Sequence, residues 1–218
     1  MNSITDESDR IPRALEILES AFGITPPPSY LEDIDKFKDL VSTWNEYASL
    51  ISSQDLASSF PSHVADSLCL VPYIDRKIQA GYSYVDVGSG GGFPALPIIL
   101  FRRSHPTVLI ERNQRKVAFL TKVIASLGLG STKVIQASYP IPVALPQPFV
   151  LTARAIEKPD AFLKGLNPLL TSGSIFLRQA GQDRLSVPPE LRATEITDTF
   201  DRMRLRRGRL YVISRPQS

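Results

Sequence analysis

The fold of this chain is decided by one stretch, Val85-Asp86-Val87-Gly88-Ser89-Gly90-Gly91-Gly92-Phe93. There a β-rich run leads directly into a glycine-rich turn, and Pro94 and Pro97 mark the first turn of a following helix. Glycine allows the backbone to turn sharply and to approach a ligand without a Cβ in the way. In α/β sheets, nucleotide-like cofactors bind at such turns between a strand and a helix. The stretch therefore predicts a cofactor site at the end of the strand.

Two classes of cofactor compete for this turn. A dinucleotide site requires the pattern G-x-G-x-x-G, and Phe93 stands where the third glycine would be. Asp86 would repel a pyrophosphate, whereas it would favour the cationic amino-acid end of S-adenosylmethionine. Glu111, 25 residues after Asp86, can accept hydrogen bonds from two ribose hydroxyls, which agrees with either cofactor. The charges favour S-adenosylmethionine and make a nicotinamide dehydrogenase the weakest candidate.

From Tyr82 onward, short β-rich runs alternate with helical patterns. The expected strands are YSYVDV, TVLIE, TKVIQ, FVLTAR, SIFLR, TEITDTF and RLYVIS. Helices are expected after Pro94, over 116–127 and over 159–170. The alternation indicates βαβ units, and the last two strands, which flank an arginine-rich turn, indicate an antiparallel hairpin. We expect an α/β fold with a mostly parallel, seven-stranded sheet.

Three helices are expected before this sheet. The first covers about 13–22, Ser29 and Glu32 form a capping-box pattern at the start of the second, and the third covers about 62–74. No repeat or low-complexity linker separates these helices from the strands. We therefore expect residues 1–80 to form a helical extension packed on the sheet and residues 81–218 to form the cofactor-binding core.

Composition limits the remaining possibilities. The chain has 218 residues, of which 43% are hydrophobic and 22% are charged, as in a single globular domain. The polar start and the lack of a long apolar run predict a cytoplasmic protein without a membrane partner. One cysteine, Cys69, and two histidines make a metal site unexpected. The net charge is +3, and the five arginines over 202–209 are either a solvated hairpin or a phosphate-binding patch.

Several motifs together resemble one family, the bacterial small-subunit ribosomal RNA guanine-N7 methyltransferases, also called glucose-inhibited division protein B. The resemblance covers about 44–181 and rests on Trp44-Asn45, His63, Asp66-Ser67-Leu68, the stretch from Asp86 to Pro94, Glu111, Arg115-Lys116, Phe119-Leu120 and Ala153-Arg154-Ala155. It implies a class I methyltransferase fold with an N-terminal helical cap. It also implies S-adenosylmethionine as methyl donor and a guanosine in the decoding-region loop of 16S ribosomal RNA as acceptor.

The resemblance also implies site residues. Those expected at the cofactor, together with Asp86, are Gly88, Ser89, Gly90, Phe93, Glu111, Tyr139, Pro140 and Arg154. Arg154 is also expected to orient the RNA, and we hypothesise that Arg178 assists it. The other candidate RNA-binding residues are His63 and Asp66, and, from the arginine-rich run outside the resemblance, Arg204, Arg206 and Arg207. Guanine N7 carries a lone pair and no proton, so no general base is expected. His63 and Asp66, three residues apart on one helix, could also be a metal or acid/base pair, but the chemistry at N7 requires neither, and a pair that stabilises the helix or docks it on the sheet is favoured.

Alternatives to this function remain at the level of sequence. A class I methyltransferase could act on another RNA, a protein or a small molecule. A non-catalytic protein that binds S-adenosylmethionine or RNA is the other alternative, because Ser138-Tyr139-Pro140 lacks the arginine and glutamate usual in the family. The partner expected first is 16S ribosomal RNA or the small ribosomal subunit, bound by a monomer.

Overall fold

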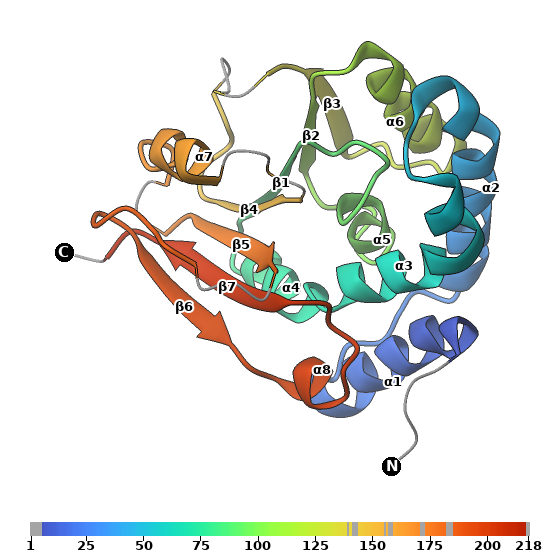
Figure 1. Ribbon diagram of the computed structural model, residues 1–218, viewed down its shortest axis with the longest axis horizontal. Helices are drawn as coiled ribbons and strands as arrows, with labels where there is room; N and C mark the ends of the chain where they lie inside the picture. Colours follow the sequence, from blue (N-terminus) through green and yellow to red (C-terminus); the bar gives the residue numbers. More distant parts are fainter. Residues whose placement is uncertain are drawn as a thin grey trace.

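The computed structural model describes residues 6–138, 140, 144–154, 156, 159–170, 173–181 and 185–216. In these residues one seven-stranded sheet carries helices on both faces (Figure 1). The strands are β1 (Ser83–Val87), β2 (Thr107–Glu111), β3 (Thr132–Gln136), β4 (Phe149–Ala153), β5 (Ile175–Ala180), β6 (Arg192–Ile196) and β7 (Arg209–Ser214). Their spatial order is β3-β2-β1-β4-β5-β7-β6.

The sheet has the predicted mixture of directions. Strands β1 to β5 are parallel, and β7 is antiparallel to both β5 and β6. The order reverses between β1 and β4, so the loops after these strands open at the carboxyl edge, where α/β sheets bind ligands. The predicted α/β class, with its C-terminal antiparallel hairpin, is confirmed.

The hairpin differs from the prediction in one detail. The expected strand TEITDTF ends at Ile196, and helix α8 (Thr199–Arg202) takes up the rest. Asp198 causes the change, because its Oδ1 accepts hydrogen bonds from the amides of Phe200 and Asp201, at 2.9 and 3.3 Å. An aspartate in this position caps a helix and ends the strand.

Seven further α-helices occur in the described residues. They are α1 (Arg10–Phe22), α2 (Tyr30–Ala48), α3 (Phe60–Leu68), α4 (Val71–Gln79), α5 (Ala95–Ile99), α6 (Gln114–Ser126) and α7 (Pro159–Leu166). A 3-10 turn (Glu7–Asp9) and a π-helical turn (Asp55–Ser59) are also present. None of these helices is both long and apolar enough to cross a lipid bilayer, within the part of the chain that is described.

Two predictions about the early helices are wrong. The helix expected over 62–74 is two helices, because Pro72 lacks an amide hydrogen and its ring excludes a continuous helix through Leu68. The capping box at Ser29 is absent, since the backbone of Ser29 is already helical and its side chain makes no capping hydrogen bond. The second helix still begins at Tyr30, as its apolar spacing requires.

Two hydrophobic clusters cover the two faces of the sheet. The larger one joins the helices from α1 to α6 to one face and includes Leu18, Phe37, Leu68 and Phe119. The smaller one joins α7 to the other face through Phe162, Leu163 and Leu166. Since one cluster includes both N-terminal helices and sheet residues, the helices contribute to the same core as the strands. The domain boundary near residue 80 stays a prediction.

Candidate active site

The glycine-rich turn follows β1 at the carboxyl edge of the sheet. Gly88, Gly90 and Gly92 have φ angles of 73°, 51° and 90°, which L side chains rarely adopt. A Cβ on Gly92 would lie 2.4 Å from Leu96 Cδ1 and 3.2 Å from Phe37 Cζ, so this side of the turn is packed against helices. A Cβ on Gly88 would meet nothing within 4 Å, so that side is open to a ligand.

Glu111 ties the glycine-rich turn to the end of β2. Its Oε2 accepts a hydrogen bond from the amide of Gly90 at 2.9 Å, and its Oε1 accepts one from the amide of Asn113 at 2.7 Å. The carboxylate is buried, and each of its oxygens can accept a second hydrogen bond. Glu111 can therefore bind ribose hydroxyls while two backbone amides hold it in place.

Asp86 lies behind the turn in a buried polar chain. Tyr84 Oη lies 2.8 Å from Thr152 Oγ1, and that hydroxyl donates to Asp86 Oδ1 at 2.5 Å. The second oxygen, Oδ2, has no hydrogen-bond partner among the described residues. Burial raises the pKa of Asp86 to about 6, against the lowering effect of Thr152 and of Ser89. The Asp86 carboxylate can thus gain from a cation or a hydrogen-bond donor delivered by a ligand.

A cleft of about 350 Å³ opens at the carboxyl edge beside these residues. Its volume lies within the usual range for small-molecule sites. The residues that line it are Val87, Gly88, Gly90, Ile110, Glu111, Arg112, Lys116, Ala137, Ser138, Ala153, Arg154, Ile156 and Phe162. Of the predicted cofactor residues, Gly88, Gly90, Glu111 and Arg154 are therefore brought together, whereas Asp86 does not line the cleft.

Several residues of the cleft were not predicted from the sequence. Ala137 and Ser138 follow β3, and Ile156 and Phe162 lie between β4 and the middle of α7. The rule that ligands bind beyond the carboxyl ends of parallel strands would have indicated Ala137 and Ser138. The sequence indicated less clearly that Lys116 would line the cleft. Its position in the first turn of α6 is set by Asn113, which caps the helix.

Other predicted cofactor residues lie away from the cleft. Phe93 is buried against the rings of Phe37, Phe60 and His63, with centroids 5.3 to 5.6 Å apart, so it supports the turn from behind. Ser89 is buried too, and its hydroxyl donates to the carbonyl oxygen of Asp86 at 3.2 Å. Both side chains therefore support the turn, and their contact with the cofactor stays a prediction. Pro140 is exposed, and Tyr139 lies outside the described residues.

Arg154 connects the cleft to helix α3. Its Nη2 donates to His63 Nδ1 at 3.3 Å and lies 4.0 Å from Asp66 Oδ2, while its Nη1 is buried without a partner among the described residues. Burial, and next the charge of Arg154, lower the pKa of His63. A neutral His63 can accept at Nδ1 and direct its Nε2 proton towards Asp55 Oδ1, 3.8 Å away.

Asp66 serves to dock α3 on the hairpin, the alternative left open by the sequence. Its Oδ1 accepts a hydrogen bond from the amide of Arg207 at 2.8 Å, and Gln179 Nε2 donates to its carbonyl oxygen at the same distance. Burial raises the pKa of Asp66, an effect that the Arg207 amide opposes. Asp66 therefore fixes the position of the helix from which His63 meets Arg154.

The C-terminal arginines divide into buried and accessible ones. Arg206 is wrong as an RNA contact, because its side chain has no exposed surface and pairs with Asp198 and Asp201 at 2.5 and 2.6 Å. Arg207 has a half-exposed side chain, 3.7 Å from Glu7. Arg204 is exposed, with a φ of 54°. Only Arg204 and Arg207 of the three predicted residues can meet a phosphate.

Arg178 and Arg154 belong to opposite faces of the sheet. Arg178 pairs across β5 and β7 with Tyr211, which belongs to the cluster under α7. Side chains alternate along a strand, so Arg178 shares this face. Arg154, in contrast, contacts α3 on the other face. Arg178 does not line the cleft, and the two arginines do not form one fork.

The cleft fits S-adenosylmethionine. The free lone pairs of Glu111 suit ribose hydroxyls, and the turn is open to a ligand at Gly88. Asp86 lies behind the turn and does not line the cleft, but its buried carboxylate adds a negative charge that favours a cationic amino-acid end. No group of three or more histidine, cysteine, aspartate or glutamate residues that could hold a metal occurs among the described residues.

The model of the GidB family, described as rRNA small subunit methyltransferase G, matches residues 30–205. The chain belongs to the GidB family. Two similar proteins, both named Ribosomal RNA small subunit methyltransferase G, are 35% identical to it. The one from Bartonella tribocorum aligns over 156 residues, 70% of this chain and 71% of its own length. The one from Gluconobacter oxydans aligns over 154 residues, 69% of this chain and 75% of its own.

Solved structures show the same fold as this GidB chain. The SAH-bound methyltransferase PaMTH1 from Podospora anserina has a TM-score of 0.61 at 14% identity, and the match covers 100% of this chain and 99% of that one. A putative O-methyltransferase from Klebsiella pneumoniae has a TM-score of 0.55 at 10% identity, covering 94% and 97%. With the family, this fold confirms the class I methyltransferase prediction, and the cofactor is S-adenosylmethionine.

Proposed function

We propose that this protein transfers a methyl group from S-adenosylmethionine to N7 of a guanosine in the decoding-region loop of 16S ribosomal RNA. Membership of the GidB family supports methyl transfer to small-subunit ribosomal RNA. One observation supports the choice of a purine as acceptor. Arg154 lines the cofactor cleft, and its buried Nη1 has no hydrogen-bond partner among the described residues. An arginine fork matches the O6 and N7 edge of guanine or a neighbouring phosphate.

In this reaction the main contribution of the protein is to orient the two reactants. When bound, S-adenosylmethionine supplies an electrophilic methyl group on a positive sulfur. The N7 lone pair lies in the plane of the guanine ring and carries no proton, so the protein has no proton to remove. The residues must instead hold N7 about 3 Å from the methyl group and in line with it, an effect worth several kcal/mol.

Each residue of the site has a proposed role. Glu111 binds the ribose of the cofactor, Asp86 favours its cationic end, and Gly88 and Gly90 bring the backbone close to it. Arg154 holds the guanine edge, and His63 and Asp66 keep the guanidinium in position rather than touching the base. Arg204 and Arg207 contact RNA phosphates beside α3, and Arg178 reaches the RNA from the α7 side of the sheet.

The partner in this proposal is 16S ribosomal RNA or the small ribosomal subunit, which a monomer meets in the cytoplasm. The test is transfer of a labelled methyl group to small subunits from cells that lack this protein, followed by chemical cleavage specific for N7-methylguanine. One cleavage site is expected. Transfer without cleavage would contradict the N7 assignment, and cofactor binding without transfer would support a non-catalytic protein.

A further inference from the structure

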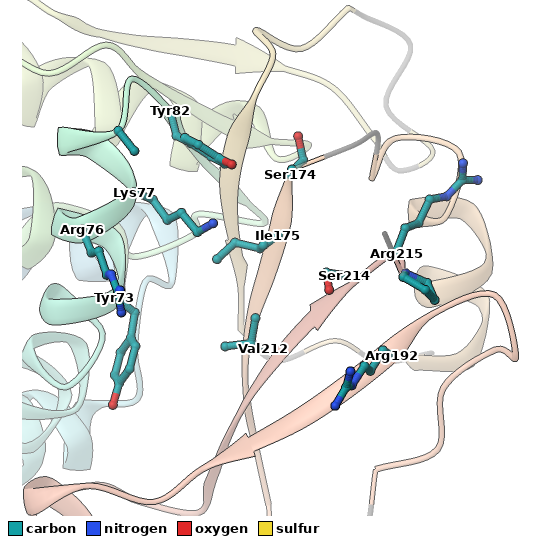
Figure 2. A pocket seen from close by; sticks show the side chains of 13 residues that line it. Tyr73, Arg76, Lys77, Tyr82, Ser174, Ile175, Arg192, Val212, Ser214 and Arg215 are labelled. Carbon is teal, nitrogen blue, oxygen red and sulfur yellow. The ribbon is translucent and has the colours of Figure 1, made fainter. Parts of the chain in front are cut away.

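A second cleft lies at the other edge of the sheet. It has a volume of about 810 Å³ and opens between α4, the start of β5 and the end of β7 (Figure 2). The cofactor cleft follows the carboxyl end of β1, whereas this second cleft lies where the parallel strands begin. A five-residue strand is about 17 Å long, so along the strands alone the two clefts are roughly that far apart.

Four cationic side chains line the second cleft, which we call the amino-edge cleft. Arg76 and Lys77 come from α4, and Arg192 and Arg215 come from β6 and from the residue after β7, on the other side in Figure 2. No aspartate or glutamate occurs among its described lining residues. The Arg215 side chain points away from α4 in Figure 2, so the charges beside α4 are mainly those of Arg76, Lys77 and Arg192. Like charges gathered in one concave surface raise the local concentration of anions.

The partners of these side chains leave their charges available. Lys77 Nζ lies 4.5 Å from the centre of the Tyr82 ring, and Arg215 Nε donates to the neutral amide oxygen of Asn167 at 3.0 Å. Arg76 and Arg192 are exposed and form no ion pair with any described residue. Asp75, beside Arg76 in the sequence, is paired with Arg102 instead. The amino-edge cleft therefore holds cations that have no carboxylate partner among the described residues.

We propose that the amino-edge cleft binds the phosphate backbone of the substrate RNA at nucleotides remote from the methylated one. The inference rests on the proposed ribosomal RNA substrate and adds a second contact region to it. A mononucleotide or other small acceptor could not reach both edges of the sheet, whereas a folded RNA presents repeated phosphates over such distances. Because phosphates carry no base information, this contact adds affinity without choosing the methylated nucleotide.

The test compares two double variants that each remove two positive charges. Arg76→Gln with Arg192→Gln alters the amino-edge cleft. Lys122→Gln with Lys133→Gln alters exposed positions on α6 and β3, at the opposite end of the strand order. Binding to small subunits from cells lacking the protein, and KM and kcat for methyl transfer to them, would be measured from 50 to 200 mM salt. Binding of S-adenosylmethionine and the midpoint of thermal unfolding report whether each variant is intact.

The cleft variant should raise KM for the subunit about tenfold at low salt and leave kcat unchanged. Loss of two phosphate contacts should make the dependence of log K for subunit binding on log salt shallower by about 1.4 to 1.8. The loss of affinity relative to the wild type should therefore shrink about 7- to 12-fold between 50 and 200 mM salt. The control variant should change both quantities much less. Equal effects of the two variants, or no effect of the first, would overturn the proposal.

The outcome is separable from that of the proposed function. Binding is measured without turnover, and the methylated atom is identified by a different experiment. A methyl group found on another atom of the RNA would contradict the N7 assignment and leave the amino-edge cleft intact. Normal N7 methylation with unchanged subunit binding in the cleft variant would support the proposed function and contradict the role of the amino-edge cleft.

Discussion

The two ends of the C-terminal hairpin hold arginines in opposite states. At the carboxyl edge, Arg206 is buried between Asp198 and Asp201. At the amino edge, Arg192 lines a cleft whose described lining residues include no acid, and Arg215 donates to a neutral amide oxygen of Asn167. The density of arginines along the sequence therefore does not tell which of them can bind an anion. Availability depends on whether the fold places carboxylates beside them.

The largest expected effect is on stability, and it comes from removing the buried arginine of the hairpin. Arg206→Met should lower the free energy of unfolding by about 3–5 kcal/mol, because two carboxylates lose their only buried cationic partner among the described residues. Arg192→Met, the matched change at the exposed end, should alter it by less than about 0.5 kcal/mol. Urea denaturation of both variants measures the difference. Similar midpoints would contradict the contrast between the two ends.

The next effect concerns an arginine that is partly paired. Arg154→Ala should lower the turnover of methyl transfer on the order of 100-fold, because the acceptor loses its orienting group. Arg154→Lys keeps the charge but not the planar fork, so it should recover only part of the rate. Lys122→Ala serves as a control on the exposed face of α6. Turnover like the wild type in Arg154→Ala would remove this residue from the site.

Asp86 supplies a smaller, pH-dependent effect on cofactor affinity. Its pKa of about 6 means that its ionised fraction rises from about a tenth at pH 5 to about nine tenths at pH 7. A cationic ligand prefers the ionised form, so affinity for S-adenosylmethionine should rise about tenfold over this range. Calorimetric titration of Asp86→Asn should show a flat profile, whereas Asp39→Asn, at an exposed position, should keep the slope.

The same carboxyl group should change stability with the opposite sign. Its pKa in the folded protein lies above the ordinary value of 3.8, so the protonated form is favoured by folding. The resulting stability is fully present below about pH 3.8 and is lost as the pH rises through about 6. Asp86→Asn should therefore stabilise the cofactor-free protein at pH 7, and the gain should disappear at pH 4 in denaturation experiments.

Local signals were enough for much of the fold. The alternation of strands and helices, the turn after β1 and the helix after Pro94 follow from periodicity and from glycine and proline chemistry over a few residues. The sequence also indicated Glu111, because it ends a buried strand, and the resemblance to the family indicated Arg154. It did not indicate α8, where the cap at Asp198 overrides a β-rich pattern, or the break at Pro72, where the helical stripe continues on both sides.

By itself, the sequence determined the class of fold, the position of the glycine-rich turn and the family, since these depend on short motifs and on their order. Only the tertiary structure decided which charged side chains are available. Phe93 packs behind the turn, Arg206 is neutralised inside the hairpin, and Arg76 and Arg192 line one cleft although they are 116 positions apart in the sequence. The physical reason is that desolvation and ion pairing depend on distances between residues far apart in the chain, which no local pattern records.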